Sequence, residues 1–267
     1  MEGFMKRGFP LLFVLILTLN QTGLLRAQYE LREKPKNAAW KPSLAFEYLS
    51  RRINWDANAY HSQLKSYLFS LCVEFEMQGG FLVNLLAGYS LTSYDEMVFR
   101  QLPFSVELDA GGLGGYLVGG QVEKRIFSSP DFEVALHGRF LFTWGLKHTW
   151  QINQLNVTGR AEGKPYWMNA DIGPLFTYTG FDYFYPYLYV NYTNFLGKFR
   201  MDEFIQSLEG SENKKFTVES NFGVSIGAIY ELSDVFSIKG EARFIPYRAG
   251  IDIGFLVNAI YSVYWRR

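Results

Sequence analysis

The chain has 267 residues, of which 18% are aromatic and only 19% are charged. Lysine plus arginine equals aspartate plus glutamate at 26 each, so no basic excess exists to neutralise nucleic-acid phosphates, and nucleic acid is not expected as a partner. One sizeable domain fits this length, and so many aromatic rings need more apolar surroundings than a soluble surface requires.

The first 27 residues have the pattern of a cleavable secretory signal peptide. An apolar stretch follows Lys6 and Arg7, and Ala27 stands at the expected cleavage point. That stretch is too short to span a bilayer as a helix, and no later stretch reaches the ~18 apolar residues that a helix needs. A single cysteine, Cys72, excludes an internal disulfide and leaves none near the cleavage point for a lipid anchor. We therefore expect an exported protein without a transmembrane helix.

Residues 28–42 are polar and broken by Pro35 and Pro42, which predicts a short lead-in to the mature chain. A single domain is expected over residues 43–265, because apolar and polar residues alternate there with the period of β-strands. Helical periodicity is not sustained after the signal peptide. The alternation predicts ten strands, at residues 43–53, 66–77, 81–91, 113–127, 132–147, 166–180, 184–195, 217–231, 235–245 and 251–265.

The connections between these strands alternate in length. Short links are expected at 78–80, 128–130, 180–183 and 233–234, and long polar loops at 54–65, 92–112, 148–165 and 196–216. Short turns on one side and long loops on the other are typical of a transmembrane β-barrel with an even number of strands. The pattern predicts an all-β, closed, antiparallel, up-and-down barrel with both termini in the periplasm. Ten strands satisfy it, and so do eight if the first hairpin is misread.

Aromatic residues on the apolar face of single strands recur eight positions apart. This spacing spans roughly 19 Å along the membrane normal for tilted strands, near the ~25 Å apolar band and its aromatic girdles. A small soluble lipocalin-like barrel, the alternative with the same alternation, does not need rings at that separation. The expected girdle residues are Tyr67, Phe75, Phe81, Tyr89, Phe184, Tyr192, Phe222, Tyr230, Phe236 and Phe244.

The opposite face of the strands carries charges of both signs. In a membrane barrel this face lines the lumen, where buried charges must be paired; in a soluble barrel it is the wet outside. Eight to ten strands leave an interior just wide enough for side chains. We expect a narrow lumen filled by Glu47, Arg51, Glu74, Glu76, Glu123, Arg125, Glu133, His137, Arg139, Lys239, Glu241 and Arg243, with added bulk from Tyr185, Tyr187 and Tyr189.

A search for catalytic motifs gives no candidate. The three histidines, His61, His137 and His148, lack the Asp-x-His element of omptin proteases and the His-x-Ser element of outer-membrane phospholipases and lipid A deacylases. A rim site combining His61 and His148 with Asp56 or Asp95 is a minor alternative. Metal-ligand spacings and a phosphate-binding loop are also absent. We predict no catalytic residues, no metal site and no cofactor.

The signal, the alternating strands, the short-turn and long-loop rhythm and the terminal segment Tyr261 to Trp265 resemble those of small bacterial outer-membrane β-barrel proteins. The resemblance covers the mature chain and selects no subfamily. It implies an outer-membrane location among lipids, and recognition of Trp265 by the barrel-assembly machinery, although Arg266 and Arg267 after it are atypical.

Architecture does not imply function, so several hypotheses stay open. The first is a structural or surface-interaction scaffold whose long extracellular loops bind a surface ligand or protein, because binding residues concentrate on loops held by rigid scaffolds. The alternative is a narrow porin-like channel for small solutes. An outer-membrane hydrolase and a soluble periplasmic lipocalin-like binder are less favoured.

Overall fold

The computed structural model describes residues 38–55, 60–77, 79–100, 106–152 and 159–264. These residues form one antiparallel sheet of thirteen strands. The strands are β1 (Ala38–Trp55), β2 (Tyr60–Met77), β3 (Phe81–Phe99), β4 (Val106–Ser128), β5 (Phe132–Gly145), β6 (His148–Ile152), β7 (Gly159–Tyr178), β8 (Phe184–Ile205), β9 (Leu208–Val218), β10 (Phe222–Ser233), β11 (Phe236–Tyr247), β12 (Gly250–Tyr261) and β13 (Val263–Tyr264).

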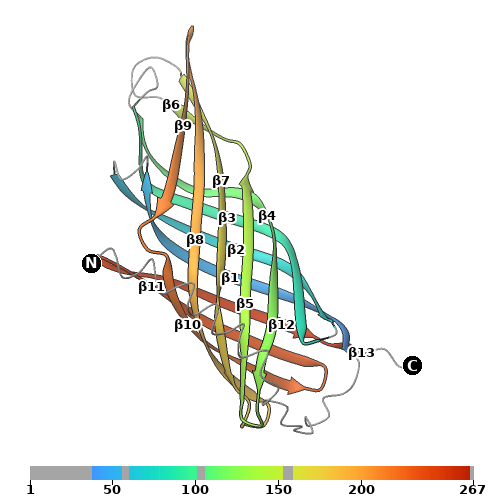
Figure 1. The fold of residues 1–267 in the computed structure, drawn as a ribbon. Helices are drawn as coiled ribbons and strands as arrows, with labels where there is room; N and C mark the ends of the chain where they lie inside the picture. The colour runs from blue at the N-terminus through green and yellow to red at the C-terminus, as the bar shows by residue number, and fades with distance from the viewer. Residues whose placement is uncertain (1–37, 56–59, 78, 101–105, 153–158, 265–267) are drawn as a thin grey trace. The chain divides into compact units, whose positions relative to one another are not determined.

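The sheet closes on itself, because β12 pairs with β1 from Ser43 opposite Ile260 to Leu49 opposite Gly254. At this level the ring runs β1-β2-β3-β4-β5-β7-β8-β10-β11-β12, each strand antiparallel to its neighbours (Figure 1). Closure removes the unpaired edges that an open sheet would expose. The predicted closed, antiparallel, up-and-down barrel is confirmed.

The number of strands differs from the ten that were predicted. β5 and β6 pair with successive parts of β7, and β10 and β9 pair with successive parts of β8. β5 and β6 therefore continue one another in the same direction, with two residues between them, and so do β9 and β10, with three residues between them. The short β13 accounts for the remaining difference, as it pairs with the beginning of β1.

The expected long loops are wrong over most of their length. Residues 92–99, 106–112, 159–165 and 196–205 extend the strands, and β8 and β9 form a hairpin that ends with Ile205 opposite Leu208. Only Gln206 and Ser207 link them, and Gln206 takes the left-handed conformation, with φ of 53°. The polar residues in these segments favour loops on sequence alone, but in the structure they alternate with buried apolar residues such as Phe199 and Met201.

The N-terminal boundary also differs from the prediction. β1 begins at Ala38, and Lys41 and Pro42 pair with Glu74 and Val73 of β2, so the end of the expected lead-in belongs to the barrel. Residues 1–27, which the sequence predicts to be a signal peptide, residues 28–37 and Trp265 lie outside the described residues. The beginning of β1 and the end of β12 lie at the same end of the barrel as the tight turns, such as the one through Gly79 and Gly80.

The outer surface of the barrel is apolar around its middle. Leu71 of β2 is 67% exposed, and the outward positions of neighbouring strands carry similar side chains, such as Leu85 and Ile226. Nine of the ten expected girdle residues are exposed, and Phe236 is half-buried. No helix among the described residues is long and apolar enough to cross a membrane. An apolar surface of this extent around the barrel is far larger than a soluble monomer exposes, and lipid covers it.

Candidate functional site

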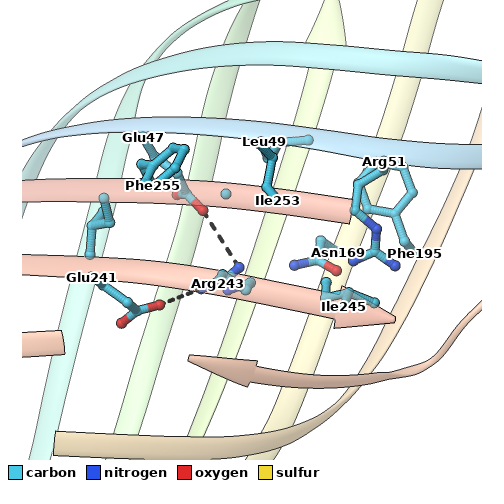
Figure 2. A pocket seen from close by; sticks show the side chains of 12 residues that line it. Glu47, Leu49, Arg51, Asn169, Phe195, Glu241, Arg243, Ile245, Ile253 and Phe255 are labelled. Atoms are coloured by element: carbon cyan, nitrogen blue, oxygen red, sulfur yellow. Dashed lines mark hydrogen bonds and ion pairs between the residues drawn. The ribbon is translucent and has the colours of Figure 1, made fainter. Parts of the chain in front are cut away.

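The inside of the barrel holds a buried ionic layer at the level of the apolar belt. Arg139 on β5 reaches across to Glu47 on β1, and its two terminal nitrogens donate to the two carboxylate oxygens, with Nη1 2.9 Å from Oε1. Arg243 on β11 lies 3.6 Å from the same carboxylate and 3.0 Å from Oε1 of Glu241 (Figure 2). The strand period aims all four side chains inward. Each charge therefore has a partner of opposite sign, as burial requires.

Two tyrosines on β8 complete this layer. The Tyr187 hydroxyl donates to Glu241 at 2.8 Å, and the Tyr189 hydroxyl donates to Asp171 on β7 at 2.7 Å. The sequence had suggested both tyrosines as inward bulk, but it missed Asp171. Strand alternation could have predicted that Asp171 points inward, because the next residue on β7, Ile172, points outward.

A small pocket lies within the ionic layer, on the side of β1, β11 and β12. Its polar lining comes from Glu47, Arg51, Asn169, Glu241 and Arg243, which point toward one another in Figure 2. The cavity has a volume of about 20 Å³, which has room for about one water molecule. The pocket is therefore a gap in a packed interior and too small for an organic ligand.

The other expected lumen charges lie nearer the tight-turn end. Glu123 Oε2 is 3.5 Å from His137 Nδ1, Arg125 pairs with Glu133 at 2.8 Å, and Lys41 pairs with Glu74 at 2.8 Å. Lys239 lies over the ring of Tyr187, and Glu76 is exposed. The structure thus joins four of the twelve residues, Glu47, Arg139, Glu241 and Arg243, in one network of ion pairs. The remaining pairs are separate from it, and Arg51 pairs with Asp252, which was not among the twelve.

A second, apolar layer fills the interior beyond the ionic one, inside the strand extensions. Trp55 of β1 packs edge-on against Phe216 of β9 at 5.0 Å between ring centroids, and Tyr94 of β3 meets Phe199 of β8 at 5.5 Å. These four side chains are at most 1% exposed. The sequence does not predict this layer, because the segments that supply Tyr94, Phe199 and Phe216 have the polar composition expected of loops. Also buried in it are Ile53, Leu64, Met97, Phe99, Leu113, Trp167, Phe195 and Met201.

The histidines do not assemble into a site. His61 on β2 bonds to Asn54 at 2.5 Å, and His148 on β6 packs against Trp150 at 4.7 Å between centroids. β2 and β6 are not neighbours in the sheet. Among the described residues no group of three or more acidic, histidine or cysteine side chains is arranged to hold a metal ion. Asp56 lies outside the described residues.

The fold has counterparts among solved structures. No protein family and no curated protein matches the sequence. The structure of the outer-membrane protease OmpT from Escherichia coli covers 86% of this chain and 97% of its own, with a TM-score of 0.51 and 10% identity. The chain has the fold of a bacterial outer-membrane β-barrel protein.

Two further structures overlap less closely. The translocator domain of autotransporter NalP from Neisseria meningitidis has a TM-score of 0.49 and 9% identity over 85% of this chain and 89% of its own. The Ail protein of Yersinia pestis has a TM-score of 0.34 and 12% identity over 84% of this chain and 98% of its own.

Proposed function

We propose that this outer-membrane barrel is a closed scaffold whose strand extensions present a binding surface outside the cell. The observation that carries the proposal is the filled interior, with the ionic layer at the membrane level and the apolar layer above it. A solute crossing the barrel would have to separate the Glu47–Arg139 pair and then displace the packed rings of Trp55 and Phe216. A channel interior instead keeps an aqueous path, which is typical of wider barrels.

The strand extensions supply the surface. β8 and β9 continue as a hairpin well past the level where β10 and β11 end, and β7 accompanies them (Figure 1). Their interior side is buried in the apolar layer, so the hairpins are rigid supports. Their outer side carries charged and polar groups such as Arg200, Asp202 and Asn213. Binding surfaces are commonly built at such rigidly held loops and tips.

Current recordings test the closed interior. The mature chain, refolded into planar lipid bilayers, is expected to insert and stay electrically silent. Discrete openings of the wild type would contradict the scaffold and favour the narrow channel. Heat-dependent migration on a detergent gel shows in the same samples that the barrel is folded.

Epitope tags test which end faces the cell exterior. A tag between Gln206 and Ser207 should be detected by antibody on intact cells, and a tag in the turn between Ser129 and Pro130 only after permeabilisation. The reverse result would place the hairpins in the periplasm and remove the proposed surface.

Attachment assays test binding itself. Cells displaying the wild type are compared with cells displaying a barrel in which residues 203–210 are replaced by a Gly-Gly turn, which keeps Asp202 opposite Ser211. Both are tested on wells coated with laminin, heparin or bacterial polysaccharide. The wild type should attach better to at least one coating. Equal attachment to all of them would contradict a binding role for this hairpin.

A further inference from the structure

We propose that β6 binds an extended peptide segment of another protein, which pairs with the exposed edge of β6 and adds a strand to the sheet. The inference rests on the binding role proposed for the strand extensions and names the chemistry of the partner. It concerns the edge of β6, whereas the attachment test concerns the tip of the β8–β9 hairpin. The two can therefore fail separately.

β6 is the edge strand of a small sheet at the far end of the extensions (Figure 1). Residues 148–152 pair with β7, and the same rows continue through β8 to residues 208–212 of β9. Just before β6 begins, the amide of Leu146 donates to the carbonyl of Gly114 on β4. Within the described part of the chain β6 itself pairs with β7 alone. Alternate residues of an antiparallel strand direct their N–H and C=O groups to opposite edges, so half of these groups on β6 have no strand partner.

The two edges of this small sheet differ in composition. The β9 edge includes the charged residues Glu209 and Lys215, and the carboxylate of Glu212 accepts a hydrogen bond from the backbone amide of Arg100 at the end of β3. Charged residues and covering segments are common ways in which proteins block an edge strand. β6 has the sequence His-Thr-Trp-Gln-Ile, with no acidic residue, lysine, arginine or proline, and Thr, Trp and Ile favour strands. β6 is therefore the edge on which a partner strand can pair.

The exposed edge does not open the interior. Ala161 of β7, directly opposite Trp150, is 0% exposed, and so is Met201 of β8 in the same sheet. A strand that pairs with β6 thus lies along the wall and leaves the apolar layer sealed. Peptide binding at this edge is compatible with the closed scaffold.

The side chains of β6 indicate which peptide it prefers. Trp150 is half-buried against the apolar layer, and a Cβ added at Gly163 of β7 would lie 2.5 Å from its ring. His148 packs against Trp150 on the same face, whereas Thr149 and Gln151 are exposed on the opposite face. Side chains on the same face of paired strands contact each other, and aromatic residues pair well with aromatic or β-branched ones. The partner should therefore alternate apolar residues, beside the two rings, with polar residues facing water.

Fluorescence anisotropy of the labelled peptide Thr-Phe-Thr-Phe-Thr-Phe-Lys tests binding to the folded mature barrel in detergent micelles, with binding to empty micelles subtracted. The control is the same peptide methylated on its five central backbone nitrogens. It keeps every side chain but lacks the donors that pair with a strand edge. It should bind about a hundredfold more weakly, because about three hydrogen bonds are lost. Equal binding of both peptides would overturn strand addition.

Two tryptophan variants test which face the peptide uses. Trp150→Ala should weaken binding about fivefold through the lost aromatic contact. Trp144→Ala removes a ring that packs against Tyr116 on β4 and should bind like the wild type. Heat-dependent gel migration shows that both variants are folded. Unchanged binding by the Trp150 variant would overturn the assignment of the apolar side chains to this face.

Hydrogen exchange locates the bound peptide. Binding should slow the exchange of backbone amides in residues 148–152 and leave those of residues 196–205 unchanged, because this part of β8 already pairs with β7 and β9. Slowing confined to other strands would overturn the assignment to β6. Absence of peptide binding, beside cells that still attach through the β8–β9 hairpin, would overturn this inference and leave the proposed function intact.

Discussion

Arg51 and Asp252 form an ion pair across the seam between β1 and β12, with Nε and Oδ2 3.4 Å apart and both side chains less than 7% exposed. Just beyond this pair β1 changes its partner, because Ile53 lies opposite Val218 of β9. The β11–β12 hairpin ends here, and the extensions continue without it. Arg51 also donates to the carbonyl of Ser220 at 3.2 Å, so it ties together the strands that meet at this junction.

Breaking this pair should destabilise the barrel strongly. Asp252→Ala leaves Arg51 buried without its carboxylate, which costs about 3–5 kcal/mol when a buried partner is removed. Urea unfolding of the barrel in lipid vesicles, followed by tryptophan fluorescence, measures the loss. Asp202→Ala, which removes the partner of the exposed Arg200, should cost about 0–1 kcal/mol. Similar losses in both variants would show that the junction has no special role.

Charge on the outer belt should be costly only where lipid covers it. Leu71 is 67% exposed at the middle of the belt, and Leu208 is 53% exposed at the tip of the β8–β9 hairpin. Leu71→Arg should lower the free energy of unfolding by about 2–4 kcal/mol, and Leu208→Arg by less than about 1 kcal/mol. Equal effects would mean that the two positions share one environment, which would contradict the membrane position of the belt.

The barrel could be predicted from the sequence because the features that indicate it lie within short stretches of the chain. Alternation between side chains such as Val224 and Ser225 sets the two faces of a strand, and tight turns such as Gly79-Gly80 set its ends. The extensions could not be predicted in this way. Phe199 and Phe216 each stand among charged residues, and a polar loop with a scattered aromatic residue has the same local composition. Only the pairing of these segments with neighbouring strands shows that they are strands and not loops.

The candidate site shows the same division. Parity was sufficient to aim Glu47, Arg139 and Arg243 inward, but which of them touch depends on how strands distant in sequence face each other across the lumen. Asp252 was missed as a partner because nothing near it in the sequence is complementary to it; Arg51 lies 201 positions earlier. The Arg51–Asp252 ion pair forms only when the barrel closes, because closure is what brings β12 beside β1.

A single methyl group should disturb the wall where two strands approach closely. A Cβ added at Gly173 of β7 would lie 1.9 Å from the carbonyl oxygen of Val190 on β8, so the strands must separate to admit it. Gly173→Ala should cost about 1–3 kcal/mol in unfolding, as overpacking commonly does. At Gly240 an added Cβ meets nothing within 4 Å, so Gly240→Ala should change stability by less than about 0.5 kcal/mol. A neutral Gly173→Ala would show that this part of the wall yields easily.

Removing one interior layer should leave the barrel closed, because the other layer still blocks it. Glu47→Ala/Arg139→Ala takes away the central ion pair together with both of its charges, and Trp55→Ala/Phe216→Ala takes away two packed rings of the apolar layer. Each double variant is expected to be silent in planar bilayers, and the fourfold variant to conduct.

Large-to-small changes at the rings cost about 3–5 kcal/mol each, so folding must be checked by heat-dependent gel migration before current is recorded. Phe69→Ala on the lipid face, where the ring is 49% exposed, is the control and should stay silent. Conduction by the ionic-layer variant alone would show that the apolar layer is not a seal, and the closed interior would then rest on the ion pairs.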